Sequence, residues 1–143
     1  MKKRIRFLAL LATLAVSLLF YHITRDEPST VPLLLTVKAE ELPVIVAETI
    51  KPAEGEATLD GYPCVVTAQL ITPTMKWDAA RGIRFPSSLY CDICFTLRVN
   101  GHARESIFYA AERLLSVGKR MRLSSSAFET EVVILEIKTG QVG

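Results

Sequence analysis

The sequence predicts a mainly β fold, a small antiparallel barrel or sandwich with short helices that follows one N-terminal transmembrane helix. Three observations lead to this prediction. Four basic residues among the first six precede a predominantly apolar run without charged residues at residues 7–21. After that run, at least five short segments alternate apolar and polar residues, which is the period of a strand. Turn-forming residues separate these segments, as the hairpins of an antiparallel sheet require.

The first 23 residues are interpreted as a basic cytoplasmic tail and a membrane anchor. A spanning helix needs about 17–25 predominantly apolar residues, and the stretch from Ile5 to Ile23 reaches this length. Bulky Tyr21 and His22 do not fit a signal cleavage site, so we expect an uncleaved anchor; a cleaved signal is the alternative. Because basic residues favour the cytoplasmic side, we expect one pass through the cell membrane and an extracytoplasmic C-terminal domain.

Residues 24–32 are polar, contain two prolines and are interpreted as a linker to one β-domain at residues 33–143. The domain is expected to begin with a strand at residues 33–38. A short helix is then predicted from Pro43 to just before Pro52, because proline is tolerated in a first helical turn; the apolar residues there also fit a strand.

The middle of the chain is expected to contain a strand and then a helical turn. Alternation predicts a strand at residues 64–71 with its core face formed by Cys64, Val66, Ala68 and Leu70. In the next segment, Thr72 fits an N-cap, Pro73 the first helical position and Gly82 a stop. These residues predict a single helical turn that carries Trp77, the only tryptophan.

The second half is expected to form hairpins. A strand is predicted up to Val99, followed by a tight turn at Asn100-Gly101 and a return strand at residues 102–110. A further turn at Gly118 leads into the last two strands, which end near Lys138.

Cys91 and Cys94 have a C-x-x-C spacing that is also found in redox and metal sites. On a strand, however, neighbouring side chains alternate, so Cys91 is expected on the apolar face and Cys94 on the polar face. This arrangement predicts structural cysteines. Cys64 also lies on the apolar face of its strand, which leaves two states open in an oxidising compartment: two buried thiols, or a disulfide between Cys64 and Cys91.

The sequence contains no pattern typical of a metal site, a cofactor site or a nucleophile elbow, and we expect a domain that is not an enzyme. Without its basic tail the chain has 13 basic against 15 acidic residues, which argues against nucleic acid as a partner. Candidate partner-binding residues are Trp77, Arg98, Arg104, Arg120 and Arg122. The arginines would form a basic face for phosphate headgroups, acidic glycans or an acidic protein partner, or only solubilise the surface. Trp77 would anchor a partner or cap the core.

The basic start, the single apolar run, the segment "PVIVAETIKP" and the ending "LLSVGKRMRLSSSAFETEVVILEIK" together resemble a family of small bacterial single-pass membrane proteins of unknown function. Val117, Gly118 and Lys119 match the late Val-Gly-Lys turn of that family. The three cysteines and residues 73–82 depart from its pattern. The resemblance implies the topology and supplies no catalytic residues.

Together these observations predict a membrane-tethered extracytoplasmic β-domain. We expect a non-enzymatic accessory or scaffold subunit of an envelope assembly, such as a secretion or surface-polymer apparatus, with a protein partner in the envelope. The alternative is an envelope thiol-redox factor or other enzyme that uses Cys91 and Cys94.

Overall fold

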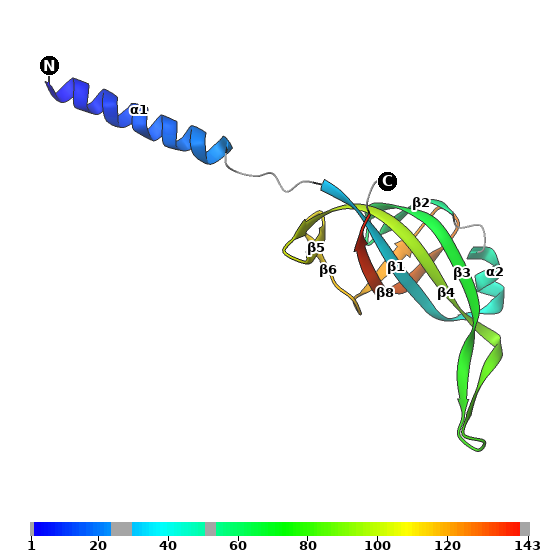
Figure 1. The fold of residues 1–143 in the computed structure, drawn as a ribbon. Helices are drawn as coiled ribbons and strands as arrows, with labels where there is room; N and C mark the ends of the chain where they lie inside the picture. The colour runs from blue at the N-terminus through cyan, green and yellow to red at the C-terminus, as the bar shows by residue number, and fades with distance from the viewer. Residues whose placement is uncertain (1, 24–29, 51–53, 141–143) are drawn as a thin grey trace.

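The computed structural model describes residues 2–23, 30–50 and 54–140, and within the first helix the side chains of residues 11–21 (Figure 1). The described residues form two helices and eight strands, with every strand pair antiparallel, so the predicted mainly β class is confirmed. The elements are α1 (Lys2–Ile23), β1 (Thr30–Pro43), α2 (Val44–Ile50), β2 (Gly55–Leu59), β3 (Tyr62–Asp78), β4 (Ile83–Arg104), β5 (Ile107–Ala110), β6 (Arg113–Leu115), β7 (Arg120–Ser124) and β8 (Glu129–Thr139).

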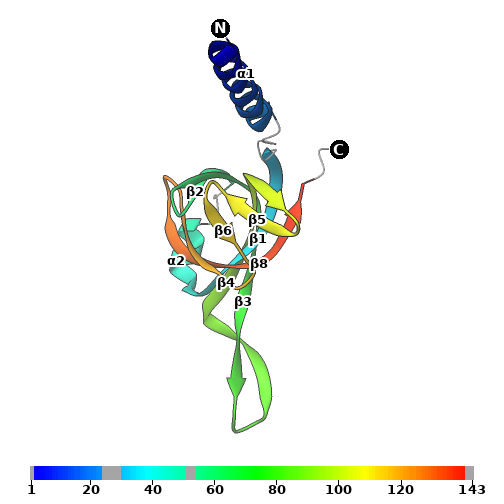
Figure 2. The same ribbon diagram turned by 90° about the vertical axis from the view of Figure 1, so that its left-hand side faces the viewer.

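Six of these strands form a closed ring. β1 pairs with β8 on one edge and with β4 on the other, and the order β8, β7, β2, β3, β4 completes the circuit. The short β5–β6 hairpin continues from the end of β4 (Figures 1 and 2). Because alternate side chains of each strand point into the ring, the core forms inside it. Its fully buried members include Leu33, Leu35, Val37, Ile93, Phe95, Leu97, Leu123 and Ile134.

Within the described part of the chain, no helix is both long enough and apolar enough to cross a membrane. This finding does not support the predicted transmembrane helix. Of the predicted anchor, residues 5–10 and 22–23 lie outside the described side chains, and residues 24–29 of the predicted linker lie outside the described residues. Residues 30–32, predicted as the end of the linker, belong instead to β1, where they pair with β4. The anchor and residues 24–29 of the linker therefore stay predictions.

The predicted helical turn at residues 72–82 is wrong, because this segment continues β3 and turns back into β4. Met75 to Asp78 pair with Ile83 to Pro86, and the side chain of Asp78 accepts hydrogen bonds from the backbone N–H groups of Ala80 and Arg81 at 3.0 and 3.2 Å. These bonds and the positive φ of Gly82 (64°) close a hairpin turn. The hairpin of residues 74–87, called the arm below, extends beyond the ring (Figures 1 and 2).

The predicted tight turn at Asn100-Gly101 is also wrong. β4 continues to Arg104, and the turn lies at Glu105 and Ser106, which both have positive φ. Gly101 is required for another reason: a Cβ atom there would lie 2.4 Å from the backbone oxygen of Tyr109 and 2.7 Å from Cδ1 of Leu33. The glycine therefore permits close approach of neighbouring strands.

The predicted strand at residues 64–71 exists, but its core face changes partway along. Cys64 and Val66 are buried, whereas Ala68 is exposed and Leu70 is 63% exposed. The register with β4 shifts between Val66 and Ala68, and such a bulge moves the following side chains to the opposite face. The predictions of a short helix after Pro43, a turn at Gly118 and two final strands are confirmed.

Candidate functional site

The two cysteines of the C-x-x-C spacing lie on opposite faces of β4, as alternation predicts. Cys91 is 5% exposed and its Sγ donates a hydrogen bond to the backbone oxygen of Leu42 at 3.6 Å, whereas Cys94 is only partly buried. Burial, together with the charge of Asp92, raises the pKa of the Cys91 thiol. A raised pKa and opposite orientations are the reverse of what a reactive dithiol requires.

The disulfide between Cys64 and Cys91 is ruled out by the register. Cys64 lies opposite Val99 in the β3–β4 pair, whereas Cys91 lies opposite Pro73. Eight residues of β4 separate the two positions, which is about 26 Å at 3.3 Å per residue. A disulfide requires Cα atoms about 4.4–6.8 Å apart. All three cysteines are free, and burial raises the pKa of Cys64 to about 11.

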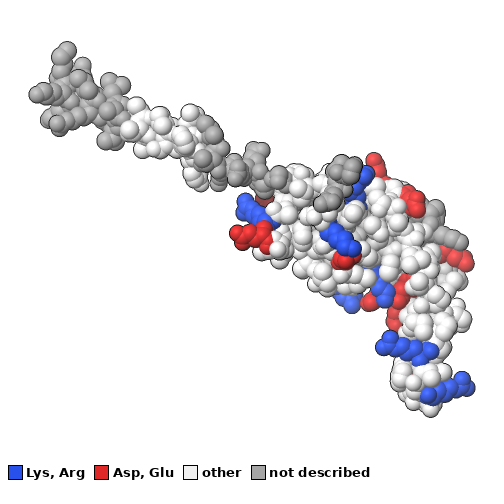
Figure 3. Space-filling view, in the orientation of Figure 1, with Lys and Arg blue, Asp and Glu red and all other residues white. Residues whose placement is uncertain are grey.

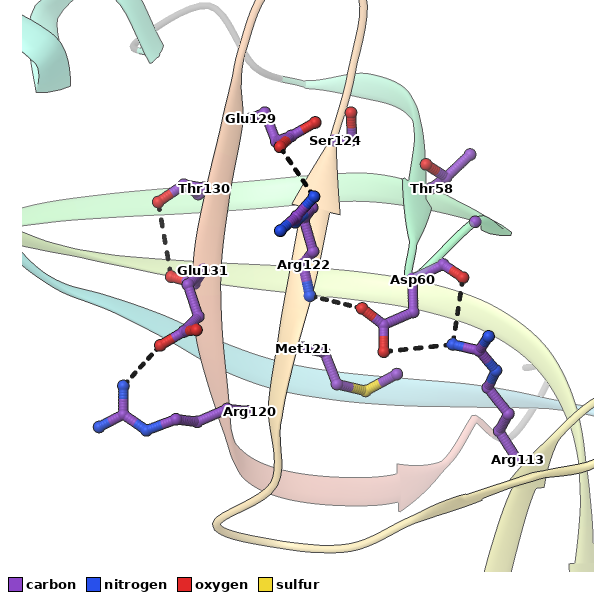
Figure 4. Close-up of a pocket in the computed structure, with 11 residues that line it drawn as sticks. Thr58, Asp60, Arg113, Arg120, Met121, Arg122, Ser124, Glu129, Thr130 and Glu131 are labelled. Atoms are coloured by element: carbon purple, nitrogen blue, oxygen red, sulfur yellow. Dashed lines mark hydrogen bonds and ion pairs between the residues drawn. The ribbon is translucent and has the colours of Figure 1, made fainter.

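Two of the predicted arginines, Arg120 and Arg122, line one surface pocket of about 810 Å³ (Figure 4). A third arginine, Arg113, lies at the edge of this pocket and was not predicted, because nothing in the sequence indicates where the short β6 strand returns. Each guanidinium has a carboxylate partner: Arg120 with Glu131 at 2.7 Å, Arg122 with Glu129 at 3.4 Å and Arg113 with Asp60 at 3.3 Å. Among the described residues that line this pocket, the three positive charges are therefore balanced by three carboxylates.

The other two predicted arginines lie elsewhere. Arg98 is exposed in the middle of β4, between Leu34 and Val65, and lines a separate pocket of about 600 Å³. Arg104 ends β4 beside the turn into β5. The four arginines therefore do not form the continuous basic face that the sequence suggested.

Trp77 is 62% exposed on the arm. Arg84 lies directly opposite it and Met75, which is 53% exposed, shares its face. Ile83 and Phe85, which are 49% and 44% exposed, lie on the other face of the hairpin. The face of the arm shown in Figure 3 carries basic side chains and no acidic one towards its far end. Trp77 therefore does not cap the core, which excludes one of its two predicted roles.

The arm is fastened to the ring by Asp92. Its carboxylate accepts hydrogen bonds from the Thr74 hydroxyl at 2.6 Å and from the backbone N–H of Glu41 at 3.0 Å, and it pairs with Lys38 at 2.8 Å. Desolvation alone would raise the pKa of Asp92, but the hydrogen bonds from Lys38, Thr74 and Glu41 outweigh it and lower the pKa. Asp92 therefore stays ionised and fixes the base of the arm.

A groove of about 790 Å³ begins at the base of the arm. Lys38, Glu40, Glu41 and Asp92 line it and are held in ion pairs, whereas Arg84, which also lines it, has no ion-pair partner among the described residues. Arg84 was missed by sequence reasoning because no element was predicted for the residues just after Gly82. The alternation in "MKWD" and "IRFP" is the signal that could have placed it beside Trp77.

In the residues that the structure describes, no three histidine, cysteine or acidic side chains gather as metal ligands would. Comparisons with models of protein families, with curated proteins and with solved structures found no match. The candidate site is therefore described by its own geometry: a projecting arm with an exposed tryptophan, an unpaired arginine opposite it, and a groove at its base.

Proposed function

We propose that the protein is a membrane-tethered domain that binds a protein partner in the extracytoplasmic space, as a non-enzymatic accessory or scaffold subunit of an envelope assembly. The observation that carries this proposal is the arm. It places several large apolar side chains in solvent on a hairpin, a position where they contribute nothing to the core. Exposed apolar clusters of this kind mark interaction sites, and tryptophan and arginine are enriched among the residues that dominate binding energy.

The position of the arm suits a tethered domain. Thr30 at the start of β1 lies opposite His102, whereas Pro43 at its end lies opposite Tyr90, close to the arm. The chain that follows α1 therefore enters the ring at the end away from the arm (Figures 1 and 2). If residues 5–23 are held in the cell membrane with the basic tail in the cytoplasm, the arm is presented away from the bilayer. Tethering raises the effective concentration of a domain against a membrane-bound partner, so a small contact surface is sufficient.

The topology is tested first. Protease added to spheroplasts is expected to digest the domain at residues 30–143 while the N-terminal segment stays with the membrane. Digestion only after lysis would overturn the extracytoplasmic placement.

The role of the arm is tested with a variant in which a two-residue Asn-Gly turn replaces residues 75–86. Crosslinking in intact cells is expected to yield a defined complex with the wild type and with Cys94→Ala, but not with the arm deletion. Circular dichroism checks that the ring still folds. Loss of the complex with Cys94→Ala, or trapping of a mixed disulfide by Cys91→Ala, would instead support the thiol-redox alternative.

A further inference from the structure

We propose that Trp77 and Arg84 form one binding site for an extended acidic segment of a partner protein. This inference rests on the proposed function and specifies the chemistry of the partner. Trp77 and Arg84 are directly opposite each other in the β3–β4 pair, and opposite residues of an antiparallel pair lie on the same face. Met75 and Pro86, which form the opposite pair two residues nearer the ring, share this face.

Arg84 is the charged residue of this face, and its positive charge selects an acidic segment. The arm as a whole contains Lys76, Arg81 and Arg84 against a single acidic residue, Asp78, and Lys76 and Asp78 lie on the other face. Lys76 is paired with Glu41 at 2.5 Å and Arg81 lies 3.7 Å from Asp78, so Arg84 is the cation without a partner among the described residues of the arm. An arginine binds a carboxylate through two parallel hydrogen bonds, and the indole beside it covers the apolar neighbour of that carboxylate.

The partner segment contacts side chains of the arm and does not pair with its backbone as an added strand. A partner strand would pair with a straight unpaired edge, but Pro73 and a register shift interrupt the β3 edge and Pro86 interrupts the β4 edge. Proline and bulges are devices that prevent strand addition. The same net positive charge disfavours a second copy of the arm as the occupant, because like charges would face each other.

The site is short. Trp77 and Met75 lie two residues apart on β3, and Arg84 and Pro86 lie two residues apart on β4, so the face spans about 7 Å, the length of two or three residues of an extended segment. Glu40, Glu41 and Asp92 line the groove nearer the ring, so the acidic residue of the segment is placed at Arg84 and not in the groove. Asp92, which holds Thr74 and Lys38 in place, keeps this surface preformed.

The experiment is a selection of random heptapeptides displayed on phage against the full chain in nanodiscs of zwitterionic lipid. We expect enrichment of peptides with Asp or Glu next to an apolar residue. The strongest peptide is then synthesised and titrated, with Trp77 fluorescence as the reporter, because this is the only tryptophan in the chain. Arg84→Glu is expected to weaken binding at least about tenfold, Arg84→Lys less, and the matched control Arg98→Glu not at all.

Peptides that carry no acidic residue, or equal affinity for Arg84→Glu and the wild type, would overturn the proposal. So would binding of the full chain's arm to vesicles of phosphatidylglycerol that depends on Arg84, since the occupant would then be a lipid surface. Trp77→Ala, measured by calorimetry, must also lose binding. A complex in cells that the arm deletion abolishes but Arg84→Glu and Trp77→Ala leave unchanged would contradict this inference and leave the proposed function standing.

Discussion

Asp92→Ala tests whether one carboxylate fixes the arm to the ring. The substitution removes the acceptor of the Thr74 hydroxyl and of the Glu41 N–H, and the ion-pair partner of Lys38. Thr74 is only 5% exposed, so its hydroxyl loses its acceptor away from water. A hydrogen bond to a charged group contributes about 1.5–3 kcal/mol, and the ion pair adds little because Lys38 reaches solvent. We therefore expect a loss of about 3 kcal/mol in the free energy of unfolding.

The assay is guanidinium unfolding of the full chain in mild detergent, followed by far-UV circular dichroism, with hydrogen exchange at the Glu41 amide as a local readout. Glu136→Ala is the matched control. It removes a carboxylate that pairs with Lys138 at 2.9 Å, but both side chains are at least half exposed, so the expected change is within about 0.5 kcal/mol. If Asp92→Ala lowered the free energy of unfolding no more than the control does, the carboxylate would not hold the arm to the ring as we infer.

The remaining predictions concern pH, thiols and core packing. The pKa of Asp92 is lowered in the folded state, so its ionised carboxylate contributes fully to the free energy of unfolding above its unfolded pKa of about 4. This contribution is lost as the pH falls through the lower folded pKa. The difference in the free energy of unfolding between wild type and Asp92→Asn should therefore become smaller as unfolding is measured at lower pH. In purified oxidised protein, alkylation and mass mapping should find Cys94 the most reactive thiol and no peptide that joins Cys64 to Cys91. Leu97→Ala should lower the free energy of unfolding by about 2–5 kcal/mol because Leu97 is fully buried. Leu70→Ala should change it by no more than about 0.5 kcal/mol because Leu70 is exposed. Equal losses for the two variants in chemical unfolding would contradict the bulge in β3.

The regular strands could be predicted from the sequence. In β4, buried residues alternate without interruption from Cys91 to Val99, and this period is enough to separate Cys91 from Cys94. The bulge after Val66 could not be predicted, since no residue type marks it, and it reverses the expected orientation of Leu70. Local patterns establish the period of a strand, but pairing with β4 determines where that period shifts.

The arm was missed because its signals are ambiguous. Thr72, Pro73 and Gly82 fit the start and stop of a helix as well as the edge and turn of a hairpin. The backbone bonds accepted by Asp78 favour the hairpin. Similarly, Asn100-Gly101 has the composition of a tight turn but continues β4, because Gly101 lies against Leu33 and Tyr109. Local composition does not encode such contacts between distant segments.

The candidate site was predicted only in part. Trp77 was identified from its residue type, but Arg84 became a candidate only when the β3–β4 register placed it opposite Trp77. The arginines chosen for their polar positions lie apart, and the two that lie together are paired with glutamates. Whether a surface cation is free depends on neighbours that are distant in the sequence.

Site-specific photocrosslinking in intact cells tests the central inference most directly. A photoreactive amino acid is placed at Met75, which is 53% exposed on the arm, in one variant and at Val117, which is 65% exposed on the loop before β7, in another. Binding through the arm predicts a crosslinked complex from position 75 and none from position 117. A complex from position 117 alone, or from neither position, would contradict the account.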